Sequence, residues 1–225
     1  MRLLALFLLT LCPAAADPVE ISLYCFRQVP GLGTIRVPTS GGAATEIRLS
    51  TANIVDPLKA ETQDGTLTFL GMPESPDKPP KPAGRVTLPG GPALVILVPA
   101  AKGAAMPYHC FTVARTDDGF PLGSYQVVNL SPFHVRGAIG RSPVEVKPAG
   151  VTRFKPEGTP GTNLGARFEF HEDGAWKLLT ETRCAIRADR RWLLFAYKDP
   201  QSGRMNLRSI PDRAGQLPAA SPEAP

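Results

Sequence analysis

Short segments in which apolar and polar residues alternate recur along this chain. They include residues 46–50, 144–147 and 166–171. Because successive side chains of a β-strand point to opposite faces of the sheet, a period of two predicts strands with one buried face. No window of 12 or more residues shows the apolar spacing of a helix without an interrupting Pro or Gly. The pattern therefore predicts an all-β chain, and the presence of 25 Pro and 21 Gly among 225 residues agrees with many turns.

Two segments, residues 93–98 and 192–197, are instead continuously apolar. Such runs are typical of central strands covered on both faces, although six residues are also short enough to belong to a buried helix. Each run is followed by a loop that contains Gly and by another strand-like segment, and the two copies lie about 100 residues apart. The corresponding segments are 21–29 with 124–130, 93–98 with 192–197, and 108–113 with 205–210. This spacing predicts an internal repeat.

Turn-forming pairs separate the predicted strands. Asp173-Gly174 lies between two alternating runs and Asp64-Gly65 precedes another, and Asp-Gly favours a tight hairpin. We therefore expect two tandem immunoglobulin-like antiparallel β-sandwich domains, each of about seven short strands. A single large sandwich or barrel is the alternative architecture.

The expected division of the chain is a first sandwich over residues 17–118 and a second over residues 119–213, joined at a short polar link, residues 116–119. A link this short implies that the halves pack together or move as a pair. Residues 73–82 contain five prolines, so we expect a stiff, extended surface loop there. The tail at residues 214–225, rich in Ala and Pro, is expected to be disordered.

The first 16 residues have the features of a secretory signal peptide: Arg2, a short apolar run, and three alanines ending at Ala16. We expect cleavage near Ala16-Asp17 and a periplasmic or secreted protein. The run is too short to span a bilayer, and no later run approaches about 18 residues, so no transmembrane segment is expected in the mature chain. A lipid anchor at Cys12 is disfavoured, because Leu11 rather than a small residue precedes it.

Three cysteines follow the expected cleavage point: Cys25, Cys110 and Cys184. An export compartment permits disulfides, but an odd number leaves one thiol unpaired in a monomer. Cys25 and Cys110 lie in the same half on predicted strands, so we expect these two to be bridged. Cys184 falls on the same predicted face as Trp176, which predicts a buried, inert thiol.

Charge is distributed unevenly along the chain. Residues 17–119 have 9 Lys/Arg and 10 Asp/Glu, whereas residues 120–213 have 15 and 9, a balance of +6. Scattered surface arginines that aid solubility are the simpler explanation, and contact with an anionic envelope component or an acidic partner is the sharper one. The candidate anionic-ligand surface consists of Arg153, Lys155, Arg167, Arg183, Arg187, Arg190 and Arg191.

Motifs for catalysis and nucleotide binding are absent from the sequence. The chain has no G-x-S-x-G, G-x-x-x-x-G-K-[ST] or H-E-x-x-H pattern and no dinucleotide fingerprint. His134 and His171 are expected at the surface rather than in a catalytic pair. A copper or zinc site made by Met106, His109 and Cys110 is disfavoured, because adjacent residues of a strand point to opposite faces. We therefore expect no enzymatic activity, no metal and no cofactor.

Residues 125–132, Tyr-Gln-Val-Val-Asn-Leu-Ser-Pro, are followed by a predicted hairpin and by Val-Lys-Pro-Ala-Gly at 146–150. This stretch resembles secreted bacterial sandwich domains of unknown function, which share a V-N-L-S-P-like first strand and a later P-A-G-like turn. The second half, which ends with residues 207–213, is similar to an uncharacterised family of exported two-domain bacterial proteins. The resemblance implies β-sandwich modules and an envelope or extracellular setting, and it brings no catalytic residues. Phe133-His134 stands where the better-known family has an acidic turn.

These features predict an exported, non-enzymatic binding or scaffold protein of the bacterial envelope. Its expected partner is an envelope or extracellular protein, or an anionic surface component. A carbohydrate-binding or carbohydrate-processing protein is the alternative, but it requires exposed aromatic residues, and Trp176 and Trp192 lie in apolar strand patterns typical of a core. An assembly chaperone that uses an exposed strand edge rests on fold analogy alone. Arg190-Arg191-Trp192 is one weak instance of Arg beside an aromatic residue, so no nucleic-acid partner is expected.

Overall fold

The computed structural model describes residues 18–39, 41–75, 77–101, 103–116, 118–199 and 202–213. The expected signal peptide and the expected disordered tail lie outside the described residues. The named elements are all β-strands, which confirms the predicted fold class. Within the described ranges no helix has the length and hydropathy needed to cross a membrane.

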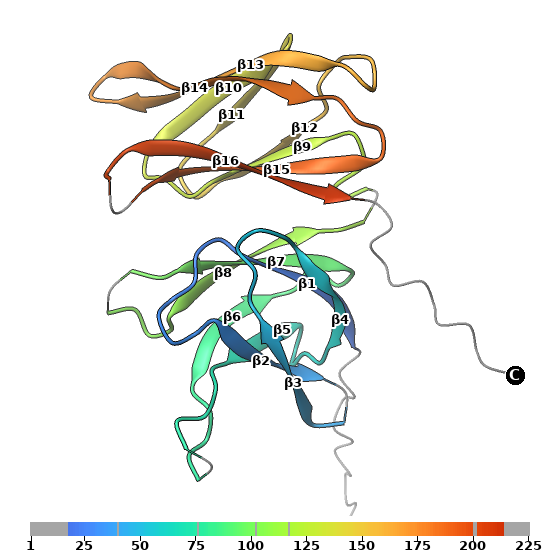
Figure 1. The fold of residues 1–225 in the computed structure, drawn as a ribbon, viewed down its shortest axis with the longest axis vertical. Helices are drawn as coiled ribbons and strands as arrows, with labels where there is room; N and C mark the ends of the chain where they lie inside the picture. The colour runs from blue at the N-terminus through green and yellow to red at the C-terminus, as the bar shows by residue number, and fades with distance from the viewer. Residues whose placement is uncertain are drawn as a thin grey trace, which may run out of the picture.

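The first half of the chain forms a sandwich of two four-stranded sheets (Figure 1). Its inner sheet, which faces the second half, has the strand order β4-β1-β7-β8, and its outer sheet has the order β3-β2-β5-β6. The strands are β1 (Val19–Cys25), β2 (Thr34–Thr39), β3 (Ala43–Arg48), β4 (Val55–Ala60), β5 (Thr66–Leu70), β6 (Pro82–Thr87), β7 (Ala93–Pro99) and β8 (Tyr108–Ala114).

The second half forms a sandwich of the same kind. Its inner sheet has the order β12-β9-β15-β16 and its outer sheet the order β11-β10-β13-β14. The strands are β9 (Tyr125–Asn129), β10 (His134–Ile139), β11 (Ser142–Val146), β12 (Val151–Phe154), β13 (Asn163–Glu172), β14 (Ala175–Ala185), β15 (Arg190–Lys198) and β16 (Met205–Arg213). The expected boundary at residues 118–119 falls between β8 and β9.

The two halves share one topology. When each strand number of the first half is increased by eight, its two sheet orders become the two sheet orders of the second half. Each sandwich has eight strands rather than about seven, and each inner sheet contains one parallel pair, β1 with β7 and β9 with β15, among antiparallel neighbours. The predicted internal repeat is therefore confirmed at the level of strand order.

Backbone hydrogen bonds align the halves residue by residue. Phe26 donates its N–H to the carbonyl oxygen of Leu97, and Leu130 donates its N–H to that of Ala196, so Leu97 and Ala196 are equivalent. Counting along the β7–β8 and β15–β16 hairpins gives the further equivalent pairs Leu94 with Leu193, Val113 with Ile210, and Arg115 with Asp212.

The two inner sheets pack face to face, so that four sheets form one stack (Figure 1). Because equivalent sheets meet, the sandwiches are related by an approximate two-fold rotation, as the subunits of an isologous dimer are. Apolar side chains fill the space between the inner sheets as a third cluster, distinct from the core of each sandwich. Its buried members are Tyr24, Phe26, Leu94, Ile96, Val113, Phe120, Val128, Leu193, Phe195 and Ile210.

The two continuously apolar runs form the central strands β7 and β15. Leu94 and Ile96 face the other half, whereas Val95 between them faces the core of its own sandwich. In β15, Leu193 likewise faces the other half, whereas Leu194 faces the core of its own sandwich. The prediction of strands covered on both faces is confirmed, and the face that points away from the strand's own core is covered by the other sandwich.

Three charged side chains meet at the interface between the halves. Nη2 of Arg115 lies 2.7 Å from Oδ1 of Asp212, and Nε of Arg191 lies 2.8 Å from Oδ2 of the same carboxylate. Arg115 also donates to Oγ of Ser22 at 2.6 Å, and Arg191 donates to the carbonyl oxygen of Phe120. The side chain of Asp212 is only 3% exposed, so its two arginine partners offset the cost of burying a carboxylate.

A β-bulge reverses the expected faces of β14. Leu179 has no partner on β13, and the register shifts on either side of it. Trp176 and Leu178 consequently face away from the core, and Leu178 is 52% exposed, while Cys184 beyond the bulge is buried. The expectation that Trp176 shares a buried face with Cys184 is therefore wrong. Trp192 does pack against the core of the second sandwich.

Candidate binding site

The seven predicted basic residues do not form one surface. Arg191 is only 6% exposed at the interface between the halves, so it cannot belong to an exposed ligand surface. Arg167 and Arg183 lie on the outer sheet of the second half. There Arg167 pairs with Glu169 and Glu181 at 2.9 and 2.5 Å, which offsets its charge locally.

Of the remaining four cations, Arg153 and Lys155 have side chains beside residues 118–123, which precede β9. Arg187 and Arg190 contact the same segment through their backbone carbonyl oxygens. Arg153 donates to the carbonyl oxygens of Asp118 and Gly119. Arg190 pairs with the carboxylate of Asp189 at 2.8 Å. The predicted anionic-ligand surface thus reduces to these four cations, and three of them, Arg153, Arg187 and Arg190, already bind groups of the protein.

The expected Cys25–Cys110 bridge is absent, and both residues are free thiols, as is the buried Cys184. Cys25 and Cys110 both pair with Leu97, one from each side of β7. Their Cα atoms are consequently two strand spacings apart, roughly 9–10 Å, which exceeds the reach of about 7 Å that a disulfide allows. The pairing was expected from the shared half and the strand pattern, but neither of these places two strands side by side.

The thiols of the first core are held in their neutral form. Burial raises the pKa of Cys110 to about 12 and also raises the pKa of Cys25. The hydroxyl of the neighbouring Tyr108 accepts the N–H of Val29 at 2.9 Å and donates to the carbonyl oxygen of Leu32 at 3.0 Å. Because the thiolate is the reactive form, these cysteines act as core residues rather than as nucleophiles.

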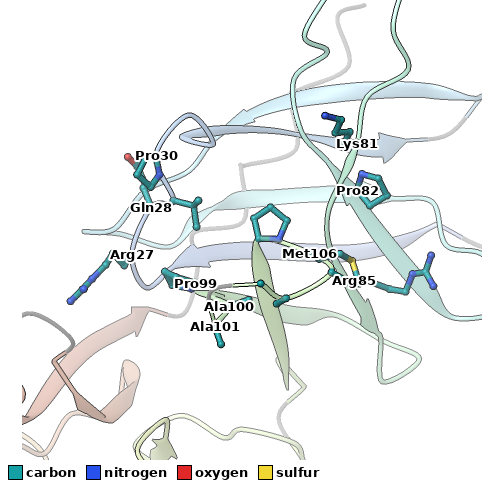
Figure 2. A pocket seen from close by; sticks show the side chains of 15 residues that line it. Arg27, Gln28, Pro30, Lys81, Pro82, Arg85, Pro99, Ala100, Ala101 and Met106 are labelled. Carbon is teal, nitrogen blue, oxygen red and sulfur yellow. The ribbon is translucent and has the colours of Figure 1, made fainter.

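A groove with a volume of about 870 Å³ lies on the first half (Figure 2). The segment that follows β1 forms one side, the start of β6 forms the other, and the loop between β7 and β8 lies between them. Lys102, in that loop, is outside the described residues. The lining is predominantly apolar and includes Met106 and several alanines, together with four prolines: Pro30, Pro82, Pro99 and Pro107.

Cations stand on both sides of this groove (Figure 2). Arg27 lies on the side of the β1–β2 connection, whereas Lys81 and Arg85 lie on the side of β6. None of the described lining residues is Asp or Glu. The groove therefore combines an apolar floor with a positively charged rim, a composition that suits an acidic ligand with an apolar portion.

The groove is built from anchored loops. The bonds of the Tyr108 hydroxyl to the β1–β2 connection fix one wall. The N–H of Ala100 donates to the carbonyl oxygen of Pro107 at 2.8 Å and closes the base of the β7–β8 loop. Proline restricts φ, so four lining prolines further limit movement. A site held in this way needs little ordering when a ligand binds.

The β7–β8 loop also borders a pocket of about 640 Å³ between the halves. His109 and Phe111 line it from the first half, and Leu130, Pro132 and Pro148 line it from the second. The imidazole and phenyl rings stand edge to face with their centres 4.5 Å apart. One loop thus separates two open spaces, and among the described lining residues only those of the first space include Lys or Arg.

Asn129 gives the V-N-L-S-P segment a structural role. Its Nδ2 donates to the carbonyl oxygens of Phe133, Val146 and Lys147 at 2.7, 3.1 and 3.1 Å. Its Oδ1 accepts the N–H and the hydroxyl of Ser131 at 3.0 and 2.7 Å. The side chain is fully buried, and its bonds tie the end of β9 to the later turn.

The histidines of the second half lie on its outer sheet, where they were expected. His134 and His171 face each other across β10 and β13, and their ring centres lie 5.7 and 5.1 Å from that of Trp176. The guanidinium carbon of Arg136 lies 4.1 Å from the centre of the Trp176 ring, and Arg136 also pairs with Glu169 at 2.7 Å. Trp176 is thus a solvent-facing aromatic residue with one ring face covered by Arg136.

Adjacent residues of β8 diverge as the alternation predicts. His109 is exposed, whereas Cys110 is buried in the first core. Across the described ranges, no three His, Cys, Asp or Glu side chains converge in a way that could hold a metal ion.

Sequence reasoning missed the groove. Arg27 and Lys81 stand 54 positions apart in the half of the chain with the lower positive charge, so neither spacing nor charge balance singles them out. The prolines on the segments that form its walls were the available signal, and they were interpreted only as loop-forming residues.

Comparison with protein-family models gives no match for this chain, and comparison with curated proteins gives none either.

Proposed function

We propose that this chain is an exported, non-enzymatic binding or scaffold protein of the bacterial envelope. Its partner is an envelope or extracellular protein, which it contacts through the groove beside the β7–β8 loop. The observation that carries the proposal is the joining of an apolar, proline-lined floor to a rim of cations. Guanidinium and ammonium groups hold anions at neutral pH and do not exchange protons there, which suits recognition better than acid–base catalysis.

The packing of the two sandwiches against each other supports a scaffold role. The apolar cluster between the inner sheets and the shared carboxylate of Asp212 join the two sandwiches into a stack. A partner bound at the first sandwich is therefore held in a defined orientation to the second. Pre-formed surfaces of this kind bind with little loss of conformational freedom.

Site-specific photocrosslinking in cells that export the protein tests the proposal. A diazirine amino acid replaces Met106 in the groove, and in a matched chain it replaces Leu178 on the outer sheet of the second half. We expect capture of one defined protein from position 106 and not from position 178. The variant Ala104→Trp, at an exposed lining position, fills the groove and should abolish the capture. Equal capture from both positions, or none from position 106, would contradict the proposal.

A carbohydrate-binding function is the second candidate, and the outward orientation of Trp176 favours it. Sugar rings stack on exposed aromatic faces, and the bulge at Leu179 places this indole on the solvent side of its sheet. Arg136 would have to leave its position over the ring for stacking on that face. Glycan-array binding that is lost in Trp176→Ala would support this function, and an array without signal would dispose of it.

A further inference from the structure

We infer that the groove beside the β7–β8 loop binds an extended peptide segment in which a short apolar stretch has a carboxylate on each side. This inference rests on the proposed function and specifies the chemistry of the partner. It follows from the separation of the cations, from their existing bonds and from the shape of the groove.

The cations are separated by the floor rather than gathered at one point. Figure 2 shows Arg27 on one side and Lys81 and Arg85 on the other, with Pro99 and Met106 between them. A single phosphate or carboxylate is best held by donors that converge on it. Donors that stand apart instead match two anionic groups joined by an apolar spacer.

The bonds already made by these cations leave Arg85 with the greatest capacity for a ligand. Lys81 pairs with Glu74 at 2.5 Å, and Arg27 lies 3.9 Å from Asp199, a distance too long for a hydrogen bond. Arg85 donates its Nε to the neutral hydroxyl of Thr68 at 3.3 Å. Its terminal nitrogens can still form the two parallel bonds that a carboxylate accepts. Arg85 is therefore the principal anchor, and Arg27 is the second.

The groove suits a peptide better than a compact small molecule. It is open to solvent, whereas sites for small molecules enclose most of the ligand surface. Its prolines and alanines offer a shallow apolar floor against which small aliphatic side chains pack. Pro-lined and Ala-lined surfaces are also stiff, so an extended segment does not have to reorganise them.

Peptide binding to the full folded protein tests the inference. The probe is a fluorescein-labelled peptide with three apolar residues between two glutamates, and the comparison peptide has glutamines in place of the glutamates. We expect the diglutamate peptide to bind with an affinity about tenfold or more above that of the diglutamine peptide. Its affinity should decrease as the salt concentration rises. Fluorescence anisotropy measures both.

The variant Arg85→Glu should bind the diglutamate peptide with an affinity lower by about tenfold or more. The matched control is Arg183→Glu, an exposed arginine on β14 that donates to the carbonyl oxygen of Asn163, and it should bind as the unchanged protein does. Thermal unfolding of both variants establishes that each is folded.

Three results would overturn the inference: no binding of the diglutamate peptide, equal binding of the diglutamine peptide, or equal losses in Arg85→Glu and Arg183→Glu. The failure of the inference is distinguishable from that of the proposed function. If position 106 captures a partner in cells and the peptides fail, only the carboxylate pattern is wrong. If position 106 also captures nothing, the proposed function is wrong as well.

Discussion

Arg115 and Asp212 occupy equivalent positions in the two halves, and they form an ion pair with each other, with 2.7 Å between Nη2 and Oδ1. Equivalent residues meet in this way only close to the axis of an approximate two-fold rotation. In a pair of identical modules both positions would hold the same charge, and the two side chains would repel each other. Opposite charges at these positions therefore favour the association of two unlike halves within one chain.

Asp212→Asn is expected to lower the free energy of unfolding by about 3–5 kcal/mol, because it leaves the buried arginines without their counter-ion. Urea denaturation measures the change. The matched control is Asp189→Asn, in which the exposed partner of Arg190 is lost, and the free energy of unfolding should hardly change because solvent screens this pair. Similar small changes in both variants would show that the shared carboxylate does not stabilise the interface.

The positions of many strands and their packing faces were largely predictable from sequence, because they follow from local patterns. The apolar runs that became β7 and β15 indicated strands covered on both sides. Asp173-Gly174 indicated a hairpin, and both residues have positive φ, 56° and 77°, at the turn between β13 and β14. Period and turn chemistry each depend on a few neighbouring residues, so one sequence suffices to read them.

Features that depend on strand adjacency or on a shift of register were not predictable. The Cys25–Cys110 bridge was expected because nothing local reveals that β7 lies between the two strands. Trp176 was assigned to the core because regular alternation places it on the same face as Cys184. A single extra residue, Leu179, breaks the alternation and moves every preceding residue of β14 to the opposite face. Arg191 was placed on the surface because no local pattern reveals its buried partner Asp212, which is 21 positions away on another strand. The groove was not predictable because it forms only where three segments that are distant in sequence come together.

Thiol reactivity separates the observed arrangement from the bridged one. In the chain that lacks residues 1–16, we expect three thiols to react after unfolding without reductant: Cys25, Cys110 and Cys184. In the folded state all three should react slowly, because burial raises the pKa of each thiol. Mass spectrometry after alkylation counts the modified residues. A count of one without reductant and three with it would restore the bridge.

Replacement of Asn129 should destabilise the second sandwich strongly. Asn129→Ala removes the partner of three buried carbonyl groups, so the free energy of unfolding should fall by about 3 kcal/mol. Asn206→Ala is the matched control, since the Asn206 amide makes a single long bond of 3.4 Å to the carbonyl oxygen of Arg204. Chemical denaturation compares the two variants, and equal losses would refute a special role for the V-N-L-S-P segment.

Stability should decrease in alkaline solution because of the first core. The pKa of Cys110 is raised from 9.0 to about 12, and that of Tyr108 from 10.0 to about 12, by burial in both cases. Near pH 7, well below the unfolded pKa values of 9.0 and 10.0, both groups keep their protons in the folded and unfolded states, so they contribute no pH dependence there. Between pH 9 and 12 the unfolded chain loses protons that the folded chain retains, so the free energy of unfolding falls as pH rises.

The slope for a single fully responding group is about 1.4 kcal/mol per pH unit. Cys110→Ala removes one of the responding groups, and its stability should therefore fall less steeply between pH 9 and 12, even though the variant is less stable at neutral pH because of the lost side chain. Urea denaturation at a series of pH values, compared as slopes rather than as absolute stabilities, measures the effect. Parallel slopes for the variant and the unchanged protein would mean that Cys110 ionises in the folded state as readily as in the unfolded one.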